Sequence, residues 1–286
     1  MRSLPEKPLF VAAAAAALVA GALVVSSFVR AGDRALLCSS LFSSSSSSPS
    51  SSSFSSELAE VLLHYATSTA VPQQSRAEIR ISFDVLRRRR PCNFLVFGLG
   101  RDSLMWSAFN AGGTTVFLEE DPKWFESVTK SSPNLRAHSV RYRTRLIEAD
   151  DLIKSYRSEP SCLPPAAAPL KNNHRCPLAL ADLPSEIFDR EWDLIMIDAP
   201  KGYYNEAPGR MAAIFSAAVM ARSRRGVGET DIFLHDVNRK VEMMYAMEFL
   251  CKKHLVGGSG RLWHFRIPPV RGNETTTSSS GEQSFC

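Results

Sequence analysis

The feature that most constrains the fold is a series of short apolar runs separated by segments with helical spacing. The first run, Asn93–Phe97, leads directly into a glycine turn. Later runs lie at Thr115–Leu118, Leu194–Ile197 and Ile232–Leu234, and the helical segments lie at Ser75–Leu86, Ser103–Asn110, Pro122–Lys130 and Met211–Arg222. Short runs without alternation are typical of strands buried on both faces, so this succession predicts a doubly wound α/β sheet of parallel strands.

The turn after the first run is the candidate cofactor site. In an open parallel sheet, ligands bind beyond the carboxyl ends of the strands, and Gly98 and Gly100 let the backbone turn tightly against a ligand. The second run ends in an acidic stretch, where a carboxylate can accept hydrogen bonds from both ribose hydroxyls of a nucleoside. Glu119 and Glu120 are the candidates, whereas Asp121 precedes a proline and fits a helix N-cap.

Two nucleoside cofactors fit this pattern, NAD and S-adenosylmethionine. A dinucleotide fingerprint would place a third glycine at position 103, but this chain has Ser103. A pyrophosphate would therefore lose its close approach to the helix. The residues favour S-adenosylmethionine, which carries no phosphate.

The candidate catalytic residues follow the two later runs. Asp198 ends one run, and His235 and Asp236 end the other, with Asn238 close behind. Asp198, Asp236 and Asn238 offer the hard oxygen ligands of a divalent cation that would lower the pKa of a sugar hydroxyl. Without a metal, His235 or Asp198 can act as general base. One carboxylate capping a helix and a packed core histidine remain the structural alternatives.

A long loop follows Asp198, and long loops in compact domains are often functional. Lys201, Arg210 and Arg239 are candidates for binding a uronate carboxylate, and Tyr203 or Tyr204 for stacking on a sugar ring.

The first part of the chain has a different composition. Pro8–Val29 is uncharged and long enough to span a bilayer, which favours an uncleaved anchor over a signal peptide. Ser43–Ser56 is nearly all serine and cannot bury enough apolar area to fold. The expected organisation is a cytosolic tail (1–7), a transmembrane anchor (8–29), a serine-rich stem (30–56), a luminal domain (57–270) and a disordered tail (271–286).

The cysteines agree with an oxidising lumen, because none has the CxxC spacing of a zinc site. Cys162 and Cys176 bracket a Pro/Ala-rich insertion, Leu163–Lys171, and Asn273-Glu274-Thr275 is a glycosylation acceptor. The formal net charge of +5 has a local excess at Arg87–Arg90, but no nucleic-acid module accompanies it. We therefore expect an anionic polysaccharide rather than nucleic acid as partner.

Many ordered blocks between about Ala70 and Pro268 resemble the plant glucuronoxylan 4-O-methyltransferase family of polysaccharide biosynthesis. The resemblance is carried by Cys92–Gly100, Asp102–Trp106, Phe117–Asp121, Trp192–Met196, Asp198–Pro200, Glu206–Met211, His235–Arg239 and Phe249–Cys251.

This resemblance implies a Rossmann-like class I S-adenosylmethionine-dependent methyltransferase in a single-pass type II Golgi membrane protein. Its acceptor would be O-4 of glucuronic acid side chains on glucuronoxylan, and an association with other xylan-synthesis enzymes is a further expectation. A divalent metal would agree with the family. Cys92 with Cys251, and Cys162 with Cys176, are the disulfides it suggests. Two positions depart from the family's usual histidines, at Arg101 and Ala111.

Two alternatives stay close to this reading. One is methylation of glucuronic acid on arabinogalactan. The other is a non-catalytic paralogue that affects xylan assembly. The sequences of such paralogues have no glycine at the position of Gly100 and no acidic run like Glu119–Asp121. This chain has both features, so catalysis is favoured.

Overall fold

The computed structural model describes residues 58, 61–62, 64–65, 67–69, 73–163, 169–270 and 284–286. The predicted cytosolic tail, anchor and serine-rich stem lie outside these residues. Within the part that is described, no helix combines the length and the apolar character needed to cross a membrane. The predicted disordered tail needs correction at its end, because Phe285 is buried against the core.

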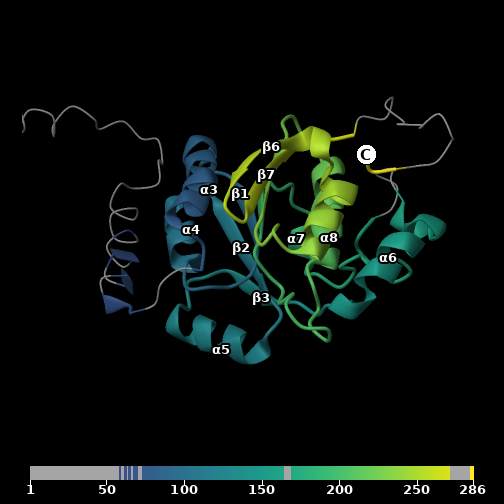
Figure 1. Cartoon of the computed structure of the whole chain (residues 1–286). Coiled ribbons are helices and arrows are strands. Elements are labelled where there is room, and N and C mark those ends of the chain that lie inside the picture. The colour runs from purple at the N-terminus through teal and green to yellow at the C-terminus, as the bar shows by residue number, and fades with distance from the viewer. Residues whose placement is uncertain are drawn as a thin grey trace, which may run out of the picture. The chain divides into compact units, whose positions relative to one another are not determined.

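Seven strands of the described chain form one mixed sheet (Figure 1). The strands are β1 (Asn93–Phe97), β2 (Thr114–Glu119), β3 (Ala137–Ser139), β4 (Leu194–Ile197), β5 (Thr230–Leu234), β6 (Leu255–Ser259) and β7 (Leu262–Ile267). Their order is β3-β2-β1-β4-β5-β7-β6. The winding direction therefore reverses between β1 and β4, which is where ligands bind in open α/β sheets.

The four strands expected from the apolar runs are confirmed, and they pair in parallel. The sheet as a whole is mixed, because β7 runs antiparallel to both β5 and β6. Strands β6 and β7 form a hairpin that was not predicted from the sequence. Strand β6 is not an apolar run, because it is largely exposed and contains Gly257 and Gly258.

Helices cover both faces of the sheet (Figure 1). The α-helices are α3 (Arg76–Arg89), α4 (Ser103–Phe109), α5 (Pro122–Ser131), α6 (Ala149–Ser155), α7 (Ser185–Phe188), α8 (Met211–Arg222) and α9 (Lys240–Tyr245). Side chains from α3, α4 and α5 share a core cluster with Phe94 and Val96 of β1. Leu95 and Phe97 point to the other cluster, which includes α8. Alternation along one strand thus builds two hydrophobic layers.

Two helices next to the site begin with side-chain caps. Ser75 begins α3 with a capping box, in which its backbone N–H donates to Glu78 Oε2 (2.6 Å). Asp121 caps α5 and Pro122 occupies its first turn, so the N-cap interpretation of Asp121 is confirmed.

The disulfides agree in part with the expectation. Cys162 and Cys176 are bonded, which closes the Pro/Ala-rich insertion. The predicted Cys92–Cys251 pair is wrong, because Cys251 bonds Cys286 and Cys92 is a buried free thiol. Cys92 belongs to the α3 and α4 side of the sheet, whereas Cys251 directly follows Leu250 in the cluster on the opposite face.

Candidate functional site

The glycine turn lies at the carboxyl end of β1. Gly98 has φ +126°, and a Cβ there would lie 3.3 Å from Ala199 Cβ. A Cβ at Gly100 would lie 2.8 Å from Asp102 Oδ1. The backbone N–H of Gly100 donates to Ser103 Oγ (2.9 Å). Glycine at these two positions therefore avoids contacts with Ala199 and Asp102, while the Ser103 hydroxyl already occupies an amide that a pyrophosphate would otherwise use.

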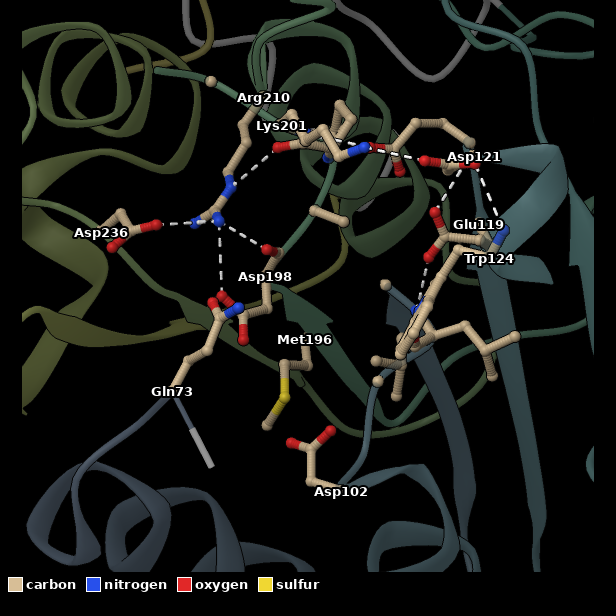
Figure 2. A pocket seen from close by; sticks show the side chains of 18 of the residues that line it. Gln73, Asp102, Glu119, Asp121, Trp124, Met196, Asp198, Lys201, Arg210 and Asp236 are labelled. Carbon is tan, nitrogen blue, oxygen red and sulfur yellow. Dashed lines mark hydrogen bonds and ion pairs between the residues drawn. The ribbon is translucent and has the colours of Figure 1, made fainter. Parts of the chain in front are cut away.

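A cavity of about 520 Å³ lies over this turn (Figure 2). Its walls come from the turn itself, the acidic end of β2, the loop after β4, and side chains that precede α3 or follow β5. The lining residues are Gln73, Gln74, Val96, Gly98–Asp102, Glu119–Asp121, Trp124, Met196, Asp198–Tyr203, Arg210, Asp236 and Arg239. The cavity has the size of a small-molecule site and occupies the switch point of the sheet.

Glu119 is the acidic residue that faces the glycine turn. Its Oε2 accepts a hydrogen bond from the backbone N–H of Leu99 (3.0 Å), and Oε1 accepts one from Asp121 (2.9 Å). Burial raises the pKa of Glu119 to about 7, and the charge of Glu120 adds to this effect, although both backbone N–H groups oppose it. The carboxylate is thus fixed in orientation and retains lone pairs for ribose hydroxyls.

The other residues of the acidic stretch hold the loop after β4. Glu120 Oε1 accepts the backbone N–H of Lys201 (3.0 Å), and Asp121 pairs with Lys201 Nζ (2.8 Å). Nearby, Trp124 Nε1 donates to the carbonyl of Leu99 (2.5 Å) and closes the cavity wall. Of the two predicted ribose ligands, the structure therefore turns Glu119 toward the glycine turn and Glu120 toward the loop.

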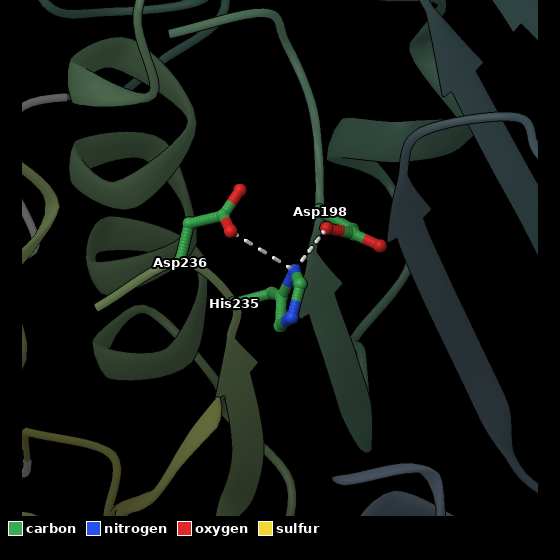
Figure 3. A group of neighbouring side chains, drawn as sticks. All are labelled: Asp198, His235 and Asp236. Carbon is green, nitrogen blue, oxygen red and sulfur yellow. Dashed lines mark hydrogen bonds and ion pairs between the residues drawn. The ribbon is translucent and has the colours of Figure 1, made fainter. Parts of the chain in front are cut away.

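Asp198 lines the cavity, and His235 lies behind it (Figure 3). His235 Nδ1 lies 2.8 Å from Asp198 Oδ1 and 3.6 Å from Asp236 Oδ1. The imidazole is 1% exposed, and it does not belong to the cavity lining. Gln74 Nε2 donates to the second oxygen of Asp198 (3.0 Å). The structure therefore places predicted His235 as a residue that positions Asp198 rather than as one that reaches a substrate.

The pKa of Asp198 is lowered despite its burial. Burial alone would raise the pKa, but the hydrogen bond from His235 and the charge of Arg210 outweigh it, with a further contribution from Gln74. Asp198 is consequently an ionised carboxylate at neutral pH.

Arg210, a predicted substrate-binding residue, lines the cavity, but its guanidinium is engaged by the protein itself. Its guanidinium is 5% exposed and contacts the backbone oxygens of His235 (2.6 Å) and Asp198 (2.5 Å). It also pairs with Asp236 Oδ2 (2.9 Å), as Figure 2 shows. Its donors are therefore used to join the ends of β4 and β5, which leaves little capacity for a ligand.

The predicted metal ligands are compensated by arginines. Asp198, His235 and Asp236 present ligand atoms within 4.8 Å of one another. Asp236 pairs with Arg239 (2.9 Å) and Arg261 (2.8 Å) in addition to Arg210. The other predicted ligand, Asn238, is exposed and does not line the cavity. A divalent cation would have to displace guanidinium groups, so this arrangement does not fit an open cation site.

The predicted sugar-stacking residues lie at the surface. Tyr203 is 68% exposed and lines the cavity, and its ring packs edge-on against that of Tyr204 at 5.2 Å between ring centroids. Exposed aromatic rings beside a polar cavity are suited to stacking on a sugar. Lys201 and Arg239 line the same cavity, but each is paired with a carboxylate.

Sequence reasoning missed Asp102, whose carboxylate points into the cavity (Figure 2). Its Oδ2 accepts from Trp106 Nε1 (2.8 Å). Burial, reinforced by the charge of Asp198, raises the pKa of Asp102, against the effect of the Trp106 hydrogen bond. The four-residue spacing of Asp102 and Trp106 on a helix was the available signal. Gln74 gave no such signal, because it precedes a helix rather than follows a strand.

The two departures from the family pattern lie in different places. Arg101 lines the cavity. Ala111 belongs to the turn before β2, which begins at Thr114, whereas the cavity lies where β2 ends. The change at Ala111 is therefore remote from the site.

Comparisons with known proteins were consistent across the chain. The family model described as IRX15/IRX15L/GXM matches residues 77–265. Arabinogalactan O-methyltransferase 2 of Arabidopsis thaliana is 59% identical over 93% of this chain and 92% of its own length. Glucuronoxylan 4-O-methyltransferase 1 of the same plant is 48% identical over 80% of this chain and 79% of its own length.

More distant matches were also found. Protein IRREGULAR XYLEM 15 of Arabidopsis thaliana is 38% identical over 75% of this chain and 67% of its own length. Among solved structures, a methyltransferase-like protein from Silicibacter pomeroyi aligns with a TM-score of 0.37 at 15% identity, over 75% of this chain and 97% of that chain. From its matched residues and its identity to these plant proteins, the chain belongs to the IRX15/IRX15L/GXM family.

Proposed function

We propose that the chain is an S-adenosylmethionine-dependent O-methyltransferase that methylates O-4 of glucuronic acid side chains on a plant cell-wall polysaccharide. The observation that carries the proposal is the cavity at the switch point of the sheet, where Glu119 is oriented by two backbone N–H groups beside the glycine turn. Relatives named as O-methyltransferases support it.

The cavity suits a class I methyl donor. Its lining contains six carboxylates, on Asp102, Glu119, Glu120, Asp121, Asp198 and Asp236, and four cationic side chains, on Arg101, Lys201, Arg210 and Arg239. With its carboxylates ionised, this lining is net negative, which favours a sulfonium cation. The amide of Gly100, occupied by Ser103, argues against a pyrophosphate.

When bound, S-adenosylmethionine supplies an electrophilic methyl group. The acceptor oxygen would bond to the methyl carbon as the sulfur–carbon bond breaks, which leaves S-adenosylhomocysteine, and the hydroxyl proton would pass to a base in the cavity. Asp198 and His235 are the bases predicted from the sequence; of the two, Asp198 lines the cavity, and its orientation is fixed by His235 and Gln74. Asp102 is the second candidate, because its raised pKa makes it the stronger base.

Comparing Asp198→Asn with Asp102→Asn separates the two bases. The variant that removes the base should lose the methyl-transfer step in single-turnover reactions and keep its affinity for S-adenosylhomocysteine. The sequence also predicts a divalent cation, but no step is assigned to it, since the carboxylates of its expected ligands are paired with arginines.

Glucuronoxylan is the acceptor predicted from the sequence, and its 4-O-methyltransferases among the relatives support it at 46–49% identity. Arabinogalactan is a second candidate, favoured by the 59% and 56% identity to two arabinogalactan O-methyltransferases. The full-length chain should transfer label from S-adenosylmethionine to one of these polymers. Cofactor binding without label on either polymer would reject the enzymatic proposal and favour the non-catalytic alternative.

The proposed location is the Golgi membrane, in a single-pass type II orientation with the domain in the lumen. The disulfides Cys162–Cys176 and Cys251–Cys286 support an oxidising compartment. Protease protection of residues 57–270 in intact microsomes tests this topology. Digestion of that domain without detergent would contradict it. Co-purification with xylan-synthesis enzymes from the same membranes tests the proposed association.

A further inference from the structure

Four cationic side chains line the cavity, and they differ in what already neutralises them. Lys201 Nζ lies 2.8 Å from an Asp121 oxygen. Arg210 is buried between Asp198 and Asp236, and Arg239 pairs with Asp236 at 2.9 Å. Each of these three cations therefore has a carboxylate partner, as Figure 2 illustrates for Lys201 and Arg210.

Arg101 is the exception. Its side chain is exposed, and the described residues give its guanidinium neither an ion pair nor a hydrogen bond. Its backbone is nevertheless anchored, because Tyr65 Oη donates to the Arg101 carbonyl (2.5 Å). Burial, together with the charge of Asp102, raises the pKa of Tyr65 to about 12, so this hydroxyl remains a donor. The guanidinium is thus free on a fixed backbone.

An acceptor that carries a carboxylate meets an electrostatic obstacle in this cavity. Carboxylates outnumber cations among the lining residues, and a uronate would be repelled unless an uncompensated cation met it. A planar guanidinium can bind a carboxylate through two parallel hydrogen bonds, which also fixes the orientation of the sugar. Arg101 stands beside Asp102 in sequence, so a sugar held there would have its hydroxyls near the catalytic carboxylates.

On this basis, and resting on the proposed function, we propose that Arg101 binds the carboxylate of the glucuronic acid acceptor. Arg101 thereby selects a uronic acid over a neutral hexose. This assignment moves acceptor recognition away from Arg210, whose guanidinium is committed to the protein itself.

The test compares two forms of each acceptor, glucuronoxylan and arabinogalactan before and after chemical reduction of their carboxyl groups. For the unsubstituted full-length chain, reduction should lower kcat/KM by about tenfold to 100-fold, the range expected from one charged hydrogen-bonded contact. For Arg101→Gln, kcat/KM on the native polymer should fall by a similar factor, mainly through KM, and reduction should then have little further effect. Arg88→Gln, an exposed arginine outside the cavity lining, is the matched control.

A binding measurement decides which carboxylate Arg101 binds, that of the acceptor or that of the methyl donor. Arg101→Gln should bind S-adenosylhomocysteine as the unsubstituted chain does, and should bind a glucuronic acid oligosaccharide more weakly. Weaker S-adenosylhomocysteine binding with an unchanged preference for the native polymer would assign Arg101 to the donor and overturn the proposal.

Two further measurements separate a folding defect from a loss of acceptor recognition. Arg101→Lys retains the charge and should recover part of the preference, while a variant that unfolds would be recognised from its thermal denaturation. An Arg101→Lys chain that folds but shows no more preference for the native polymer over the reduced polymer than Arg101→Gln does would count against the charge-based assignment. Absence of transfer by the unsubstituted chain to any of the four polymers would instead refute the proposed function, which distinguishes the two failures.

Discussion

Glu119→Gln is the most direct perturbation of the proposed cofactor site. In the structure, one carboxylate oxygen accepts from the Leu99 N–H and the other from the Asp121 N–H. An amide has a single oxygen, so its NH₂ group must oppose one of these two donors. The variant therefore loses a charged acceptor for the ribose and gains a conflict between buried donors.

The two effects appear in different measurements. Loss of one charged hydrogen bond is worth about 1.5–3 kcal/mol, which weakens S-adenosylmethionine affinity roughly tenfold to 150-fold. The opposed donors are present with or without ligand, so they lower the free energy of unfolding by about 1–3 kcal/mol rather than the affinity. Calorimetric titration measures the first quantity, and urea denaturation the second.

The direction in which S-adenosylmethionine affinity changes with pH distinguishes a specific role of Glu119 from a nonspecific defect. The pKa of Glu119 is about 7, and ribose hydroxyls favour its ionised form. Affinity should therefore rise with pH through 7 and then level off. In the absence of ligand, the raised pKa means that the contribution of this group to stability is present below its ordinary value of 4.5 and is lost as pH rises through 7. Glu119→Gln should abolish both trends.

Glu120→Gln is the matched control, since it makes the same chemical change at the next residue. Glu120 accepts the backbone N–H of Lys201 and is turned away from the glycine turn. Its substitution should change affinity by no more than about twofold to threefold. The reasoning is refuted if Glu119→Gln binds S-adenosylmethionine normally, or if both variants weaken binding equally.

Three further outcomes are expected. Asp198→Asn should slow single-turnover methyl transfer by about 100-fold or more with little change in S-adenosylhomocysteine affinity, and His235→Gln should cause a smaller loss of the same kind; a pure affinity defect in either variant would contradict their roles. Cys251→Ser should lower the free energy of unfolding by roughly 3–4 kcal/mol, because the bond to Cys286 closes a loop with a sequence separation of 35; an unchanged urea midpoint would contradict this. Cys92 should resist alkylation until the protein unfolds, since burial chiefly raises its pKa to about 12, and mass spectrometry of native samples would reveal any earlier labelling.

The strands of the sheet were predictable where burial on both faces produces a continuous apolar run in the sequence. β1 and β4 are apolar runs because both of their faces are covered by helices, and each ends at the residue expected. The hairpin of β6 and β7 has a weaker sequence pattern. β6 is exposed and glycine-containing, and His264 of β7 is buried through its contact with Asp231 (2.7 Å), a pairing across strands that periodicity does not express.

The site was predictable as a set of strand ends but not as a set of roles. Asp198 and Asp236 were located because chemistry in such a fold gathers where strands end. For Arg210, the sequence shows a charge but not that the side chain is buried. Its partners, Asp198 and Asp236, lie on two different strand ends, so only the folded chain reveals that its guanidinium joins them. The same pairing makes an apparent cation site from oxygen ligands that arginines have already neutralised.

Ser103 shows how a departure from a motif can be a positive feature. In the sequence it is a missing glycine, which argues only that a dinucleotide loses some contact. In the structure its hydroxyl accepts the N–H of Gly100 and so withdraws one of the donors on which phosphate binding at such turns depends. Beside the same turn in space, the carboxylate of Glu119 remains available for a ribose. In the proposed function, the turn therefore keeps an acceptor for a ribose while it lacks a phosphate site, and this combination suits a cationic, phosphate-free methyl donor.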